Sequence, residues 1–152
     1  MNTVDLISRR RRFRQHGVAA VEFALVAALF FTILIGTMEM GRVLFYWNSA
    51  AEATRLGARI AVVCDLDNAN IKTRMQTMLS ILPANKISIT YQPAGCDVST
   101  CDSVTVSILP TVPVATFIPF VPLSLTLPPF STTLPRESML STIGGQANPV
   151  CM

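Results

Sequence analysis

The pattern of apolar and polar positions changes twice along this chain. Val18 to Met38 make up 21 positions, and Glu22 is the only charged residue among them. An α-helix of this length spans about 30 Å at ~1.5 Å per residue, which matches the hydrocarbon thickness of a bilayer. We therefore predict one membrane-spanning helix, and no second candidate span follows it in the sequence.

The helical pattern continues beyond the span. Residues 39–63 contain no proline, so we expect one helix from about residue 18 to 63, with Gly36 and Gly41 as candidate bends. One face of its second half carries a stripe of small residues, namely Ala50, Ala53, Gly57 and Ala61. Small residues let a neighbouring element approach closely. That neighbour is either a second helix or the chain's own C-terminal domain.

A short helix is expected next. Asp67 or Asn68 can cap its N-terminus, and Pro83 ends it. Its apolar face consists of Ile71, Met75, Met78, Leu79 and Leu82.

The following residues predict a small sheet. Residues 87–91 and 104–108 alternate between apolar and polar side chains, which is typical of an antiparallel hairpin with one buried face. The stretch 110–135 holds seven prolines and no charge, so only short edge strands are expected there, around 123–127 and 131–134. The predicted fold class is therefore α+β, with a long N-terminal helix followed by a small antiparallel sheet domain over residues 64–152.

Charge is unevenly distributed along the chain. Residues 1–17 hold five arginines against Asp5 alone, whereas the other 135 residues hold seven basic and eight acidic side chains. A content of 51% hydrophobic and 14% charged residues excludes a disordered protein. Arginines flanking a span mark its cytoplasmic side, so we expect a cytoplasmic N-terminus and residues after about 45 outside. This topology explains the basic segment without nucleic acid. Tyr46 and Trp47 suit either an interfacial aromatic belt or packing against the C-terminal domain.

Four cysteines follow the span, on the side where disulfides are favoured. Cys96 and Cys101 could close a loop at the hairpin tip, which leaves Cys64 and Cys151 to clip the C-terminal tail to the stem helix. Four cysteines allow three connectivities, and the sequence alone does not decide between them. Free thiols and a zinc site are the alternatives, but C-x4-C without a second close pair is a poor zinc motif. We expect no metal.

Enzymatic chemistry finds little support in the sequence. The only histidine, His16, lies in the basic segment, and the acidic residues are scattered singly. No glycine-rich phosphate loop is present, and Gly144-Gly145 is interpreted as part of a flexible tail. We therefore expect neither catalysis nor a cofactor.

Glu22 is the most informative residue of the span. A carboxylate in an apolar span is costly and defaults to a paired or functional role. No lysine or arginine lies at its i+3 or i+4 position, and Val18 occupies i−4. If the chain were cut after Gly17, Val18 would present a free α-amino group at the membrane face, and a neighbouring subunit's amine could meet Glu22.

These features resemble a type IV prepilin, and more closely the TadE-like pseudopilins of the tight-adherence (Flp) pilus. Residues 17–23 read G-V-A-A-V-E-F, similar to the family's G-A-A-A-V-E-F. Residues 39–42, E-M-G-R, resemble its E-x-G-R, and residues 53–59, A-T-R-L-G-A-R, resemble its A-x-R-x-G-A-R. The resemblance covers roughly residues 9–62.

The resemblance implies a role for each matching residue. A prepilin peptidase would cleave after Gly17, which removes residues 1–17 and makes Val18 the mature N-terminus. Glu22, followed by Phe23, would act in cleavage recognition or in docking to a neighbouring subunit. Glu39 and Arg42, three residues apart on one helix, are expected to neutralise one another.

The implied function is that of a minor pilin precursor in the bacterial inner membrane. Its partners would be the prepilin peptidase, a major pilin, other pseudopilins, the inner-membrane assembly platform and membrane lipid. The alternative is an uncleaved single-span anchor whose outer domain scaffolds a secretion or adhesion complex. Removal by ordinary signal peptidase is disfavoured because the apolar run is long, carries Glu22 and lacks an A-x-A site.

Overall fold

The computed structural model describes residues 3–116 and 125–152, with side chains from Gly17 onward. The chain divides into two compact units, one ending at Met40 and one running from Gly41 to Met152. The first unit is helical, and the second combines helices with small antiparallel sheets. This arrangement confirms the predicted α+β fold class.

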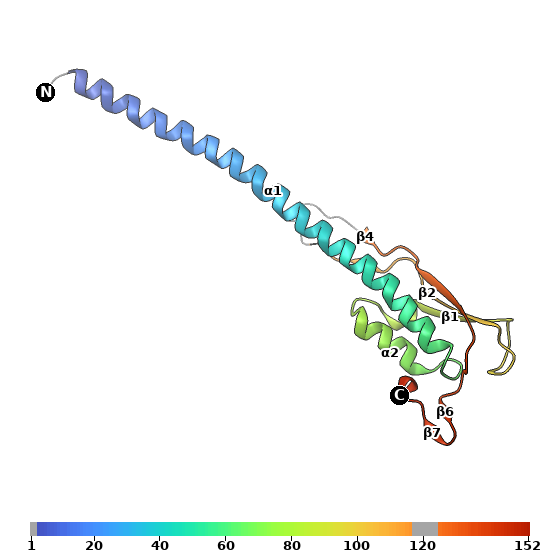
Figure 1. The fold of residues 1–152 in the computed structure, drawn as a ribbon. Coiled ribbons are helices and arrows are strands. Elements are labelled where there is room, and N and C mark those ends of the chain that lie inside the picture. The colour runs from blue at the N-terminus through green and yellow to red at the C-terminus, as the bar shows by residue number, and fades with distance from the viewer. Residues whose placement is uncertain (1–2, 117–124) are drawn as a thin grey trace. The chain divides into compact units, whose positions relative to one another are not determined.

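Helix α1 runs from Thr3 to Ala61 (Figure 1). It begins within the basic segment, upstream of the expected start, and ends close to the expected end. No proline interrupts it, so every backbone N–H beyond its first turn can take part in the helical ladder. Gly36 and Gly41, the candidate bends, both lie inside the helix.

In the second unit, the C-terminal part of α1 packs against α2 (Ala69–Met78) and strand β2 (Ser103–Ile108). All four members of the small-residue stripe are buried. A Cβ added to Gly57 would stand 2.5 Å from Sδ of Met75 on α2 and 3.1 Å from Val106 on β2. The chain's own domain therefore occupies the stripe, which decides between the two alternatives left open by the sequence.

Helix α2 is capped by Asn68, whose side chain accepts a hydrogen bond of 2.9 Å from the backbone N–H of Asn70. Four of the five residues of its predicted apolar face are buried, namely Ile71, Met75, Leu79 and Leu82. Met78 is 46% exposed, so its assignment to that face was wrong. The helix ends at Met78, and the extended backbone of Leu79 (φ −129°) turns Leu79 into the core instead.

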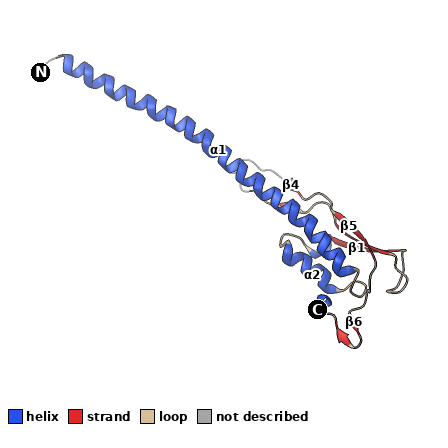
Figure 2. Ribbon diagram, viewed as in Figure 1, coloured by secondary structure: helices blue, strands red, loops and turns tan. Residues whose placement is uncertain are grey.

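The predicted hairpin is present as strands β1 (Ile87–Gln92) and β2, which pair antiparallel with Ile89 opposite Val106. Strand β5 (Ser131–Pro135), drawn in red with β1 in Figure 2, pairs with the other edge of β2. The sheet order is therefore β1-β2-β5. The central strand alternates in burial, with Val104, Val106 and Ile108 buried. On the opposite face, the hydroxyls of Thr105 and Thr133 lie 2.8 Å apart.

The described residues of the second unit also form two further strand pairs and two short 3₁₀ helices. Strand β3 (Pro113–Val114) pairs with β4 (Leu125–Thr126), and β6 (Thr142–Ile143) pairs with β7 (Gln146–Ala147). The 3₁₀ helices are η1 (Ala84–Lys86) and η2 (Pro149–Cys151). The edge strand expected at 123–127 is present at β4, while residues 123 and 124 lie outside the described residues.

The prediction that Gly144 and Gly145 belong to a flexible tail was wrong. They form the two-residue turn between β6 and β7, with φ of +60° and +81°. Two consecutive residues with positive φ are typical of the type I′ hairpin turn, and glycine adopts that conformation without steric cost.

Candidate functional site

The junction singled out for processing lies on α1. Val18, Glu22 and Phe23 are all exposed, and Val18 and Glu22 stand one helical turn apart on the same face. A Cβ added to Gly17 would meet nothing within 4 Å. Among the side chains described, those of residues 17–116 and 125–152, no hydrogen bond or ion pair of Glu22 is found. Glu22 is thus accessible to a group from outside the chain.

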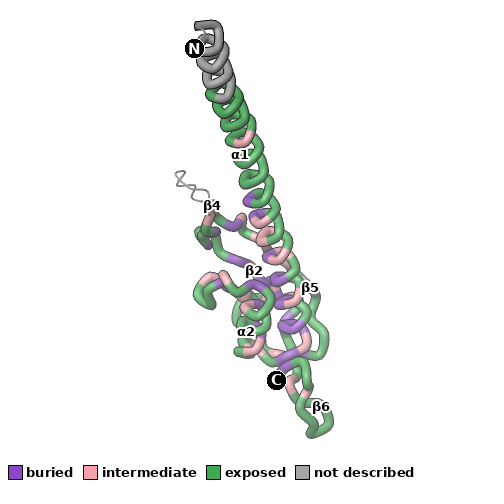
Figure 3. The backbone as a smooth tube through the Cα atoms, turned by 90° about the vertical axis from the view of Figure 1, so that its left-hand side faces the viewer, coloured by how far each residue is buried: buried purple, intermediate pink, exposed green. Residues whose placement is uncertain are grey.

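The span that follows the junction is uncovered. Its large apolar side chains are exposed along α1 (Figure 3). The segment Gly17–Ala61 is long and apolar enough to cross a membrane, with a mean hydropathy of 2.6 in its most apolar window, none of which is buried. An exposed apolar helix of this length fits a membrane-anchored protein.

Glu39 and Arg42 lie just beyond the span. Glu39 is buried, with 9% of its surface exposed. In the second unit, the Arg42 guanidinium donates a 2.5 Å hydrogen bond to the carbonyl oxygen of Ala115 and lies 5.9 Å from the ring centroid of Tyr46. Arg42 therefore ties α1 to the chain next to β3, a contact that the sequence did not indicate.

The four cysteines lie in two bonded pairs. Cys64 and Cys151 have their sulfur atoms 2.00 Å apart, and Cys96 and Cys101 have theirs 1.95 Å apart. The first pair joins the segment after α1 to the C-terminal η2 across 87 residues, whereas the second closes the loop between β1 and β2.

Hydrogen bonds from α2 also hold the C-terminal tail. The side-chain amides of Asn68 and Asn70 donate to the carbonyl oxygen of Cys151, at 3.3 and 2.7 Å. Arg74 donates to a backbone oxygen of Met152 at 3.3 Å. The tail is thus held by the disulfide to Cys64 and by three hydrogen bonds, one from the N-cap of α2 and two from α2 itself.

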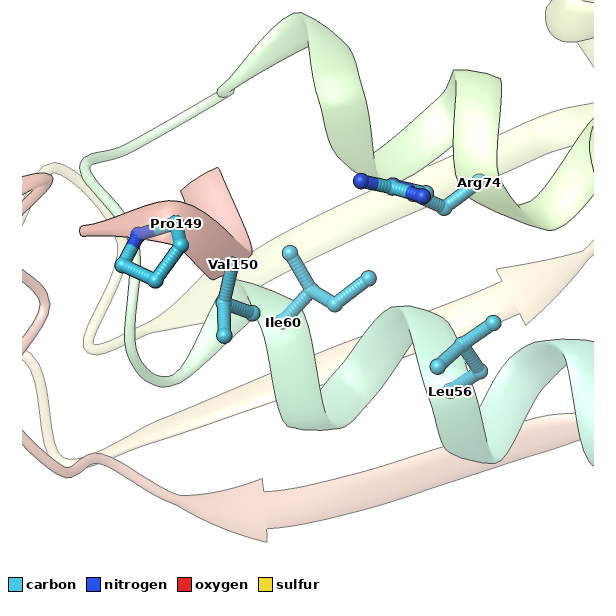
Figure 4. Close-up of a pocket in the computed structure, with 5 residues that line it drawn as sticks. All are labelled: Leu56, Ile60, Arg74, Pro149 and Val150. Atoms are coloured by element: carbon cyan, nitrogen blue, oxygen red, sulfur yellow. The ribbon is translucent and has the colours of Figure 1, made fainter. Parts of the chain in front are cut away.

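A pocket of about 370 Å³ lies beside this tail (Figure 4). Arg74 is the only one of its five lining residues that carries a charge, and the apolar members are Leu56, Ile60, Pro149 and Val150. An apolar surface with a single guanidinium offers no acid, base or nucleophile for a reaction.

Two ionisable groups of the second unit have shifted pKa values. Hydrogen bonds from the side chain and backbone of Ser99, and from Thr100, lower the pKa of Asp97 to about 2. Burial raises the pKa of Tyr91, against the opposing effect of the hydrogen bond that Asp67 N–H donates to its hydroxyl. The negative charge of Asp67 raises the pKa of Tyr91 further. Within the described part of the chain, no group of three or more His, Cys, Asp or Glu residues could hold a metal ion.

Residues 17–59 of the chain match the family of TadE-like proteins. This segment is TadE-like. The match confirms the resemblance predicted from the junction and indicates a role in the assembly of Tad pili. TadE-like proteins are structural pilus components rather than a known enzyme family. Comparisons with curated proteins and with solved structures find no match to the chain.

Four consecutive large residues of the TadE-like segment, Leu44 to Trp47, differ in burial, and the sequence had singled out only Tyr46 and Trp47. Tyr46 and Trp47 are half-buried and pack against the core of the second unit, so the second of their two interpretations is correct. Leu44 and Phe45, beside them, are exposed. The helical period already contained this information, because Tyr46 precedes buried Ala50 by one turn.

Proposed function

We propose that this chain is the precursor of a type IVb pseudopilin, or minor pilin, that acts in assembling a tight-adherence pilus for surface attachment. The observation that carries the proposal is the position of the TadE-like match, which begins at Gly17. Gly17 is the residue after which a prepilin peptidase would cut. The basic residues 1–16 lie outside the matched segment, in keeping with a leader that is removed.

Gly17 itself supports a recognition role. Glycine inside a helix costs about 0.5–1 kcal/mol relative to alanine. Among the described residues, no neighbouring atom requires its small size, since an added Cβ meets nothing within 4 Å. Gly57, by contrast, is needed for packing because a Cβ there would stand 2.5 Å from Met75. A glycine at position 17 that the fold does not need is consistent with selection by a peptidase.

Glu22 and Val18 would then provide the docking contact between subunits. Cleavage after Gly17 converts Val18 into an α-amino group at the edge of the span. The carboxylate of Glu22 is exposed one turn along the helix, and pairing with a neighbouring subunit's amine would offset the cost of its place in an apolar span. Phe23 adds an exposed aromatic surface next to that contact.

The proposed topology follows from the same features. Residues 1–17 would be the cytoplasmic leader, residues 18–63 the span and stem, and residues 64–152 a periplasmic domain. The implied partners are the prepilin peptidase, a major pilin and other pseudopilins, and the inner-membrane assembly platform. Glu39 and Arg42 would stabilise the start of the stem rather than bind a partner.

N-terminal sequencing of the protein from native membranes tests the processing step. We expect the mature chain to begin at Val18. A chain that begins at Met1 would contradict processing and would favour an uncleaved membrane anchor that scaffolds a secretion or adhesion complex.

A matched pair of variants locates the cut. Gly17→Leu should accumulate as full-length precursor on a gel, whereas Gly36→Leu should be processed normally, because neither site is crowded in the fold. Unchanged processing of Gly17→Leu would refute the assigned bond.

A second pair tests docking. Glu22→Gln should be processed but should be missing from the purified pilus fraction, while Glu52→Gln, an exposed acid beyond the span, should be incorporated like the wild type. Normal incorporation of Glu22→Gln would refute the docking role.

A further inference from the structure

The exposed apolar surface of α1 does not end where the sequence ends the span. Beyond Met38, the helix still exposes large apolar side chains at Met40, Leu44 and Phe45, and Phe45 is 65% exposed. Leu44 and Phe45 belong to the second unit rather than to the first. Leu44 follows Met40 by four positions and Phe45 follows Met38 by seven, which is helical spacing.

Beyond Glu22, the two charges that would interrupt this surface are withdrawn from it. Glu39 is buried. Arg42 is partly buried, and its guanidinium is held by the carbonyl oxygen of Ala115 and the ring of Tyr46. After Glu22, the next exposed charge along α1 is therefore Glu52.

The length of this surface exceeds the hydrocarbon of a bilayer. Val18 to Phe45 comprise 28 residues, or about 42 Å of helix at ~1.5 Å per residue. The hydrocarbon is about 30 Å thick, and about 40–45 Å with the headgroup layers. An apolar surface of this length fits the hydrocarbon together with most of the adjoining headgroup layers.

We propose that Leu44 and Phe45 insert into the bilayer leaflet next to the second unit, so that this unit is seated on the membrane surface. The proposal rests on the membrane anchoring within the proposed function. Lipid is the occupant because Leu44 and Phe45 follow closely after the span on the same helix and are bulky apolar residues rather than the small ones that favour close helix contact. The small residues of the stripe, which lie further along α1, are already covered by the chain's own domain.

Spin labels on single introduced thiols test the proposal. All four native cysteines are in disulfides, so a label attaches only at the introduced site. Leu44→Cys and Phe45→Cys, with Phe30→Cys inside the span and exposed Arg59→Cys beyond the surface as controls, are reconstituted as the full chain in vesicles of phosphatidylcholine and phosphatidylglycerol. Trp47 fluorescence verifies that each variant is folded. Collisions with oxygen, which enters lipid, and with a water-soluble nickel chelate are then measured.

We expect the nickel collision rate at positions 44 and 45 to be several-fold lower than at 59, with a high oxygen collision rate. Nickel collisions at 45 equal to those at 59, with position 30 protected, would overturn the seating while leaving the span intact. Low rates for both reagents at 45, relieved by diluting the protein with lipid, would mean that a second copy covers the surface and would also overturn the proposal. Nickel access at position 30 would refute the membrane anchoring itself.

Discussion

Two parts of helix α1, residues 18–38 and residues 50–61, share the helical backbone conformation but differ in which side chains they expose. From Val18 to Met38, large apolar side chains are exposed on every side of the helix. From Ala50 to Ala61, one face consists of small buried residues and the other is polar, with Arg55 donating a 2.6 Å bond to Glu52. A helix without a protein partner needs lipid around its whole circumference, whereas a helix with a partner needs only one matched face. The comparison predicts that substitutions in the two parts have different consequences.

The largest loss of unfolding free energy should come from removing the disulfide between Cys64 and Cys151. Joint Cys64→Ser and Cys151→Ser substitution opens a loop with a sequence separation of 87, and the chain-entropy account gives a loss of about 4–5 kcal/mol in unfolding free energy. Cys96→Ser with Cys101→Ser opens a loop with a sequence separation of 5 and should cost about 2 kcal/mol. Urea unfolding in micelles, followed by the fluorescence of the single tryptophan, measures both.

Membrane association serves as the control for these variants. Extraction with carbonate should leave both double variants in the membrane, because neither disulfide involves the span. Equal losses of stability, or release of either variant from the membrane, would contradict the separation between the two parts of α1.

Truncation of one large side chain in each part of α1 should change the unfolding free energy by different amounts. Ile60→Ala removes a side chain that is 4% exposed and should cost about 2–5 kcal/mol. Phe30→Ala lies in the exposed part and should change the unfolding free energy of the second unit by less than about 0.5 kcal/mol. The same urea titration measures both variants, and similar losses would show that the span is coupled to the stability of the second unit.

Substitutions of two glycines of α1 should give a smaller difference in unfolding free energy. Gly57→Leu forces a side chain against Met75 and Val106, and overpacking of this kind costs about 1–3 kcal/mol. Gly41→Leu, where an added Cβ meets nothing within 4 Å, should gain about 0.5–1 kcal/mol from helix propensity. Thermal unfolding followed by circular dichroism distinguishes them, and a stabilised Gly57→Leu would refute the packing assigned to the stripe.

The smallest effect on stability is expected from Asp97, which lies in the loop between β1 and β2 and belongs to neither part of α1. Because the folded-state pKa of Asp97, about 2, lies below its unfolded value of 3.8, its hydrogen bonds stabilise the fold above about pH 4. That contribution is lost as the pH falls from 3.8 towards 2. Ser99→Ala should raise the pKa of Asp97, while Ser103→Ala should not. Carboxyl NMR titration measures this pKa, and an unchanged value in Ser99→Ala would contradict the assigned cause.

Much of the fold was predictable because it depends on local patterns. The alternation in residues 87–91 and 104–108 predicted strands β1 and β2, and Asn68 predicted the start of α2. Met78 is the last residue of α2, and it was misplaced because the backbone leaves the helical conformation at Leu79, so that Leu79 enters the core and Met78 stays exposed. Gly144 and Gly145 were taken for a tail because a two-residue hairpin with very short strands has almost no alternation to detect.

Some residues of the candidate site were likewise predictable from the sequence, and others were not. The junction from Gly17 to Phe23 was identified from residue types alone, because a leader, a glycine and an intramembrane acid are defined by order along the chain. Its processing and docking roles stay predictions for the experiments above. The exposed pair Leu44 and Phe45 was missed because the span was ended at Met38 by its composition, although the helical period separates this pair from the small-residue stripe.

The sequence by itself determined the span, the uninterrupted helix and the alternating strands, because hydropathy and backbone propensity act between near neighbours. Only the tertiary structure decided that the chain's own domain fills the small-residue stripe, that β5 joins the open edge of β2, and that Arg42 turns to Ala115. These contacts join residues far apart in the chain. Their formation depends on shape and hydrogen-bonding complementarity in three dimensions, which no local pattern encodes.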